Sequence, residues 1–306
     1  MDLFGETTVL PTGPALLSRR TGAPLHVTAV YHDGKGYHCH VGPPLWPDTS
    51  KPLRAALADT TQQIADGFAE LISRAPEQWH VLEPLQRRSG NGPLGVGIHV
   101  EDLHSILPDG PVPLVGSSWG AMLALAYAAE HPDRVSKLIL IGCGTFDRKA
   151  RARLVEIRDG RMDDAMQETM MRIDAQLGAA ASPEEKDRLL DELGDLIHPL
   201  YNYDPITTDM EVTGVDAAGN SETWNDMVRL QDEGVYPAAF RAIEAPAIML
   251  HGDHDPHPGR MIYEGLRPHV ADLIYVELEH CGHYPWIERQ ARATFFQLLR
   301  QALREE

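Results

Sequence analysis

The residues of this chain with the clearest chemical potential are a serine in a glycine-bounded turn and two polar clusters that follow it. Ser118 lies in the run Gly-Ser-Ser-Trp-Gly at 116–120, after the apolar run 112–115 and before the alanine-rich run 121–129. This is the order strand, tight turn, helix, and a G-x-S-x-G in that setting predicts a nucleophile elbow that lifts the serine hydroxyl above the sheet edge. We attribute both glycines to a close approach of strand and helix that leaves no room for side chains. Ser117 is expected to be only the variable residue of the turn.

A serine hydroxyl becomes a useful nucleophile at neutral pH when a histidine takes its proton and a carboxylate orients that histidine. Carboxylates follow the apolar run 246–251, and histidines follow the apolar run 273–278. Both runs predict buried strands, and open α/β sheets place their sites at the carboxyl ends of strands. The candidates are Asp253 and Asp255 for the acid, and His280 and His283 for the base.

From about residue 93 to the end, the chain resembles the α/β-hydrolase superfamily, especially its proline-iminopeptidase-like and small bacterial ester or peptide hydrolase branches. In that family the acid lies three residues after a strand-end glycine, as Asp255 lies after Gly252, and the base follows a glycine before the last helix, as His283 does. The resemblance implies a triad of Ser118, His283 and Asp255. The backbone N–H of Trp119, which follows the nucleophile, is the expected oxyanion donor.

Other roles remain open for the neighbouring polar residues. Asp253 is the alternative acid or the cap of a short helix, and His280 is the alternative base. His251, His254 and His257 have a spacing that could suggest a metal site, but their loop contains Pro-Gly, and we interpret them as solvated loop histidines. The sequence implies no metal and no organic cofactor.

The expected fold class is α/β, with a mostly parallel sheet of the α/β-hydrolase type. Val135–Ile141 predicts the strand after the elbow helix, and residues 145–242 are mostly helical and charged, with helical periodicity in 151–167 and 183–197. In the resembled family this position holds a helical cap that covers the site and shapes the substrate pocket. We assign substrate contact to four aromatic residues of this stretch, with the core of the cap as their alternative role: Tyr201, Tyr203, Trp224 and Tyr236.

Composition limits the partners of the chain. It has 306 residues with 27 basic and 45 acidic side chains, a net charge of −18. A strongly acidic protein lacks the positive face that nucleic acid or anionic lipid requires, so the expected partner is a small-molecule or peptide substrate. No apolar run approaches the roughly 20 residues of a membrane span, and the acidic start lacks the pattern of a signal peptide. Three scattered cysteines predict neither disulfides nor a zinc site, which favours a cytoplasmic location.

The acidity begins near residue 90. Residues 1–92 carry 8 basic and 9 acidic side chains, a net of −1, so the remainder carries 27 − 8 = 19 and 45 − 9 = 36, a net of −17. The run Ser-Gly-Asn-Gly-Pro at 89–93 has chain-breaking residues at this change. We therefore predict a segment of different origin at 1–90 and the hydrolase core with its cap at 91–306.

The first segment resembles the carboxyl half of the lysophospholipid acyltransferase family, which includes the lipid A lauroyl and phosphatidylinositol mannoside acyltransferases. The resemblance covers residues 1–88 and is carried by 4–15, 20–25, the helical stretch 53–74 and Pro-Glu-Gln-Trp-His at 76–80. The catalytic His-x4-Asp or Glu of that family has no counterpart here. Peripheral membrane contact is expected, if anywhere, through residues 1–90.

The segment before the elbow also lacks a feature of the hydrolases. The resembled family has a His-Gly-Gly or similar loop that donates the second oxyanion N–H, and residues 1–92 contain no such motif. The glycines at 13 and 42 are followed by prolines, which have no N–H to donate. Three readings stay open: a hydrolase slowed by an incomplete oxyanion hole, acyl transfer by the first segment, and an inactive fusion product. A further alternative is that residues 1–92 are a divergent front half of the hydrolase, with strands at 24–31, 36–41 and 79–82.

Overall fold

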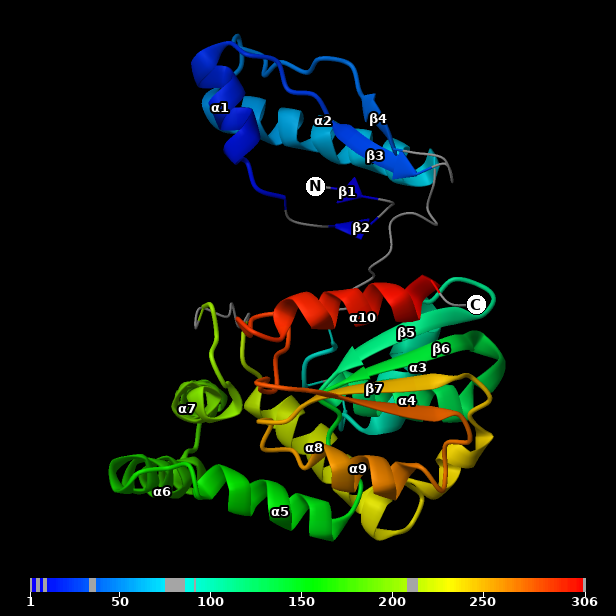
Figure 1. The fold of residues 1–306 in the computed structure, drawn as a ribbon. Helices are drawn as coiled ribbons and strands as arrows, with labels where there is room; N and C mark the ends of the chain where they lie inside the picture. Colours follow the sequence, from blue (N-terminus) through cyan, green and yellow to red (C-terminus); the bar gives the residue numbers. More distant parts are fainter. Residues whose placement is uncertain are drawn as a thin grey trace. The chain divides into compact units, whose positions relative to one another are not determined.

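The computed structural model describes residues 2–3, 6–7, 10–32, 37–74, 86–90, 92–207 and 214–304. The chain divides into two compact units, Met1–Pro84 and Leu85–Glu306 (Figure 1). The predicted boundary at residue 90 lies close to this division and stays a prediction about evolutionary origin. No described helix has the length and apolar character needed to cross a membrane.

The first unit is a small α/β arrangement. Its elements are β1 (Asp2–Leu3), β2 (Glu6–Thr7), α1 (Gly13–Thr21), β3 (Thr28–His32), β4 (Tyr37–Val41) and α2 (Leu53–Arg74). β3 and β4 form an antiparallel pair, and β1 pairs with β2. Val27, Ala29 and Leu71 form a core between the hairpin and α2, and the Tyr31 hydroxyl donates to the Leu71 carbonyl at 2.7 Å. Of the alternative front-half strands, the expected strand at 79–82 lies outside the described residues.

The second unit is built on a parallel sheet in the order β5-β6-β7-β8. Its strands are β5 (Val112–Ser117), β6 (Val135–Ile141), β7 (Ala247–Gly252) and β8 (Leu273–Leu278). All three pairings are parallel, so the carboxyl ends of the four strands meet at one edge. The predicted parallel sheet is confirmed.

Helices cover both faces of this sheet, as Figure 1 shows. They are α3 (Val96–Ile106), α4 (Trp119–Glu130), α9 (Gly259–Leu266) and α10 (Arg292–Arg304), with a 3₁₀ turn η2 (Pro132–Arg134) before β6. Along β6, Leu138 and Leu140 point into a core with α3, α4 and α9, whereas Ile139 and Ile141 point into a second core with α10. This alternation is the two-sided burial expected of a parallel strand.

Between β6 and β7 lies a helical insertion, residues 145–246. It contains α5 (Arg148–Asp159), α6 (Asp164–Ala179), α7 (Pro183–Ile197), η3 (His198–Tyr201), α8 (Ala217–Asp232) and η4 (Ala238–Ala242). Side chains cap the helix starts: Asp147 accepts from the N–H of residues 149 and 150, Asp163 from that of residue 166, and Ser182 from that of residue 185. The stretch 151–167, whose periodicity is helical throughout, is therefore divided between two helices. The first, α5, ends at Asp159, and Asp163 caps the start of α6.

One edge of the sheet is formed by the strand that leads into the serine turn. Among the described residues, β5 pairs with β6 alone. Val115, in the middle of β5, is 49% exposed although it belongs to a parallel strand. Pro113 lies in this strand, consistent with the rule that proline occurs in edge strands.

Candidate active site

Ser118 occupies the strained turn that the sequence predicts. Its φ is +53° and its ψ −117°, a positive-φ conformation that residues with a Cβ rarely adopt. The turn is held by the Ser118 N–H, which donates to the Ile141 carbonyl at 2.8 Å, and by the Ser118 carbonyl, which accepts from the N–H of Ala121 and Met122. Strain of this kind persists where surrounding bonds enforce it, and it is frequent at functional sites.

The two glycines of the turn have different reasons to be glycine. A Cβ on Gly116 would lie 2.3 Å from the Gly120 carbonyl oxygen and 2.6 Å from the Ala121 nitrogen, so no side chain can be accommodated there. A Cβ on Gly120 would have nothing within 4 Å. The steric explanation is confirmed for Gly116 and is wrong for Gly120, where the structure shows no crowding.

Asp255 and His283 meet at the carboxyl edge of the sheet. The Nδ1–H of His283 donates to Oδ2 of Asp255 at 2.6 Å, and both residues are buried. Burial raises the pKa of the Asp255 carboxyl, but the neighbouring His283 and His251 and the hydrogen bonds from His257 and His283 outweigh it and hold that pKa well below its usual value. Asp255 is therefore an ionised acceptor. In a neutral imidazole, a proton on Nδ1 leaves the lone pair on Nε2, so the bond to Asp255 fixes which nitrogen can accept a proton.

The serine turn and the histidine are connected through the end of β6. Ile141 accepts the Ser118 N–H, and the next residue, Gly142, lies against the imidazole: a Cβ on Gly142 would be 2.9 Å from Nδ1 of His283. Gly142 also has a φ of +52°. The strand-end glycine after β6 thus allows the His283 imidazole to lie close to the strand that anchors the Ser118 turn.

Two histidines interpreted from sequence as solvated are instead packed around Asp255, which corrects that interpretation. His257 donates its backbone N–H and its Nδ1–H to Oδ1 of Asp255, both at 2.9 Å, and its ring stacks on that of His283 with centroids 4.7 Å apart. His251 is fully buried, with Nε2 2.9 Å from the His257 carbonyl and 3.3 Å from Oδ2 of Asp255. The third histidine, His254, packs against Tyr203.

Asp255, His257 and His283 also form the one metal-type cluster found among the described residues, with one ligand atom of each within 4.8 Å of the others. The Nδ1 atoms of both histidines are already bonded through their protons to the carboxylate. The arrangement is that of a hydrogen-bonded acid and its bases, and it requires no ion to account for these contacts.

The alternative acid and base have other contacts. Asp253 accepts the backbone N–H of His280 and of Cys281, each at 3.1 Å, and so joins the two loops that carry Asp255 and His283. His280 is exposed and has a φ of +54°. Neither is part of the buried pair.

The four aromatic residues assigned to substrate contact are found in different environments. The Tyr201 ring lies edge-on to both His257 and His283, at 5.7 and 5.5 Å between centroids, so the structure brings it to the site. Tyr203 packs on His254 and His280, Trp224 is 38% exposed on α8, and Tyr236 is buried in the core against Phe240. Burial raises the pKa of the Tyr236 hydroxyl to about 12.

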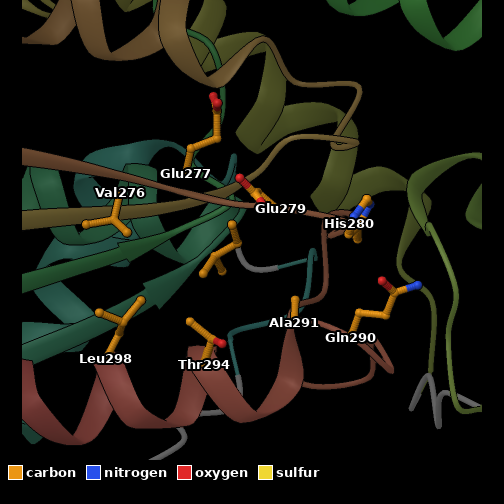
Figure 2. Close-up of a pocket in the computed structure, with 9 residues that line it drawn as sticks. Val276, Glu277, Glu279, His280, Gln290, Ala291, Thr294 and Leu298 are labelled. Carbon is orange, nitrogen blue, oxygen red and sulfur yellow. The ribbon is translucent and has the colours of Figure 1, made fainter.

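A pocket of about 420 Å³ lies between β8 and α10 (Figure 2). Its lining includes His280 but neither Ser118, Asp255 nor His283. We therefore assign no substrate to it.

Two further residues near His283 and Asp255 were not predicted from the sequence. Glu288 is fully buried and accepts the N–H of Gly282 next to His283. Arg161, between α5 and α6, donates to the carbonyls of Leu200 at 2.5 Å and His254 at 2.8 Å, so it links the helical insertion to the acid loop. Neither residue has a spacing signal, since Arg161 acts on backbone groups distant in sequence and Glu288 also accepts the distant N–H groups of residues 203 and 204.

Comparison with known proteins gives a separate result for each unit. The family model for bacterial lipid A biosynthesis acyltransferase matches residues 1–88. The phosphatidylinositol mannoside acyltransferase of Mycobacterium tuberculosis is 42% identical over 84 residues, which are 28% of this chain and 25% of that enzyme. The chain thus spans about a quarter of the length of this relative.

The second unit has relatives of another kind. The cis-3-alkyl-4-alkyloxetan-2-one decarboxylase of Shewanella oneidensis is 29% identical over 146 residues, covering 45% of this chain and 41% of that enzyme. The crystal structure of VinJ is similar over 68% of this chain and 72% of its own, at 18% identity and a TM-score of 0.46. The family model for the alpha/beta hydrolase fold matches residues 98–290, more than half of the chain. This protein belongs to the alpha/beta hydrolase fold family, which its parallel sheet and serine turn already suggested.

Proposed function

We propose that the protein is a serine hydrolase that cleaves an ester or amide bond of a small molecule or peptide with Ser118, His283 and Asp255. The observation that carries the proposal is the buried bond of 2.6 Å from His283 to an ionised Asp255, next to the strand that anchors the Ser118 turn. A bonded acid and base beside a strained serine is the constellation that serine hydrolases use on unrelated folds.

In the proposed reaction the Ser118 hydroxyl attacks the substrate carbonyl carbon while Nε2 of His283 takes its proton. Asp255 holds the imidazole in the required tautomer and stabilises the imidazolium that forms. Collapse of the tetrahedral intermediate returns this proton to the leaving alcohol or amine and leaves an acyl-enzyme. Water, deprotonated by His283, then releases the acid and restores the serine.

The oxyanion is assigned to the backbone N–H of Trp119, the first residue of α4. The first N–H groups of a helix have no partner within the helix, and the N-terminus favours a negative charge. A second donor has no assigned residue, and the Gly42 N–H, from one of the two glycine motifs of the first segment, already donates to the Val27 carbonyl. Loss of one donor costs about 10²–10³ in rate, so a low turnover is part of the proposal.

The substrate pocket is assigned to the helical insertion acting as a cap. Tyr201 is the cap residue that supports this, because its ring contacts the rings of both His283 and His257. Tyr203 and Trp224 are exposed in the same insertion and remain candidates, whereas the buried position of Tyr236 favours its alternative role in the core.

Labelling with a fluorophosphonate probe tests the nucleophile. We expect wild-type protein to label and to hydrolyse p-nitrophenyl esters, and Ser118→Ala to lose both, with a fall in rate of roughly 10⁴-fold or more. Ser117→Ala is the matched control, since it removes the adjacent hydroxyl. Equal labelling of wild type and Ser118→Ala would sink the assignment.

A second candidate function is acyl transfer to a lipid by residues 1–88, favoured by their 42% identity to a phosphatidylinositol mannoside acyltransferase. Incubation with acyl-CoA and a lysolipid in the Ser118→Ala background separates the two functions. Acyl transfer that survives the substitution would support this candidate. If no acyl transfer is detected, this second function is rejected and only the proposed hydrolase function is retained.

We also propose a cytoplasmic location, because the three cysteines are free thiols, as is usual in a reducing compartment. Cell fractionation is the check, and recovery outside the cytoplasmic fraction would contradict it.

A further inference from the structure

One buried carboxylate contributes to the attachment between the loop that carries the proposed base and the helical insertion. Glu288 is 0% exposed, and three backbone N–H groups donate to it. Those of Tyr203 and Gly282 reach Oε1 at 2.7 and 2.9 Å, and that of Asp204 reaches Oε2 at 2.7 Å. Two donors come from the segment after η3, and the third belongs to the residue before His283.

Backbone hydrogen bonds run beside this carboxylate. The His283 N–H donates to the Tyr201 carbonyl at 2.7 Å, and the Ile206 N–H donates to the Ile287 carbonyl at 2.8 Å. The packing is tight as well, because a Cβ on Gly282 would lie 2.2 Å from the Tyr201 carbonyl oxygen. The loop at 282–288 therefore cannot shift without moving residues 201–206.

We propose that Glu288 is a positioning residue for His283, which it fixes against Asp255 by tying the base loop to residues 201–206 of the helical insertion. This inference rests on the proposed function of His283 as the base and deepens it. A carboxylate suits this role since it offers several acceptor sites and no donor, so it can satisfy three N–H groups at once. Backbone donors left unpaired in a buried position are costly, which keeps both segments on the carboxylate.

Glu288→Gln tests the proposal with little change in volume. Glutamine has one acceptor oxygen, and its NH₂ group would face a backbone N–H, so at least one of the three bonds is lost. We expect kcat per fluorophosphonate-titrated site to fall about 10-fold and KM to change less than about 2-fold. A misplacement of about 1 Å can cost about 10²-fold in rate, so a smaller shift of His283 should cost less. Dividing the rate by the number of titrated sites removes the effect of unfolded protein. If Glu288 had only a structural role, its substitution would change the unfolded fraction and leave kcat per titrated site unchanged.

Glu279→Gln is the matched control. It makes the same chemical change on an exposed residue of the same stretch, whose side chain lines the pocket beside β8 (Figure 2). Its kcat per titrated site should equal that of the wild type.

Amide hydrogen exchange supplies a readout that does not depend on activity. In Glu288→Gln, the peptides covering 201–206 and 280–289 should both exchange their amide hydrogens faster than in the wild type. In Glu279→Gln, the exchange of both peptides should be unchanged. If the wild type fails to label, the proposed hydrolase function fails while the exchange result still decides the link between the two segments. An unchanged kcat per titrated site, or unchanged exchange in either peptide, overturns the role of Glu288.

Discussion

At the scale of single residues, the site is organised around one carboxylate. Asp255 accepts from His283 on one oxygen and from His257 on the other, and His251 approaches the first. This arrangement holds three imidazoles within reach of a single negative charge. Two of these contacts, those of His251 and His257, could not be predicted from the sequence, because loop histidines at this spacing are equally compatible with solvent exposure.

The buried His251 gives the protein a predictable response to acid. Burial lowers its pKa from 6.5 despite the nearby Asp255, so it is neutral in the folded chain where an unfolded histidine takes up a proton. Below about pH 6.5 the unfolded state therefore binds more protons than the folded state. The contribution of His251 to the free energy of unfolding is present above about pH 6.5. It falls as the pH drops below that value, by up to about 1.4 kcal/mol per pH unit for one such group. We expect His251→Gln to reduce this slope.

Chemical unfolding at about pH 7.5 and about pH 5.5 measures this effect. Glutamine retains an N–H for the His257 carbonyl but does not titrate in this range, and the difference from wild type at the higher pH gives the cost of repacking. His99, His198, His254 and His269 also have lowered pKa values through burial, so part of the slope should persist. If the free energies of unfolding of variant and wild type differ by the same amount at both pH values, the prediction is contradicted.

At the scale of elements, the positions of strands and helices were more predictable from the sequence than the contacts that these elements make. The positions of β6, β8 and α7 follow from apolar periodicity and from breakers, since these signals are local. The break between α5 and α6 and the bonds of Glu288 depend on capping and on distant backbone groups, which a single sequence does not show. The elbow was recognisable from its flanks, whereas the difference between its two glycines required the geometry of α4.

That difference leads to opposite expectations for the two glycines. Gly116→Ala should destabilise the second unit by about 1–3 kcal/mol or more, because its Cβ would overlap the Gly120 carbonyl. Gly120→Ala should be neutral or stabilise α4 by up to about 1 kcal/mol, since alanine is favoured over glycine in a helix. Thermal unfolding of the two variants checks this, and equal destabilisation would show that both positions are crowded.

At the scale of the whole molecule, the chain combines two units that each possess a core. The first is centred on Val27, Ala29 and Leu71, and the second has one core on each face of its sheet. The net charge and the sequence pattern change near residue 90, which lies close to this division.

Independent cores predict independent folding of the larger unit. A fragment of residues 85–306 should be soluble and should melt at the temperature of the corresponding transition in the full chain. Calorimetry of both proteins is the measurement, with the full chain as the reference. A fragment that aggregates, or that melts well below the full chain, would show that residues 1–84 stabilise the sheet.

The position of Ser118, directly after the edge strand β5, has a consequence for how the proposed activity would be lost. Among the described residues this strand has a hydrogen-bonded neighbour on one side only, and the strained turn of Ser118 is held to the sheet through Ile141 of that neighbour. Edge segments open more readily than central ones, and strain lowers the cost of opening further. On warming, the proposed catalytic arrangement should therefore relax before the sheet melts, so that loss of the proposed activity precedes denaturation.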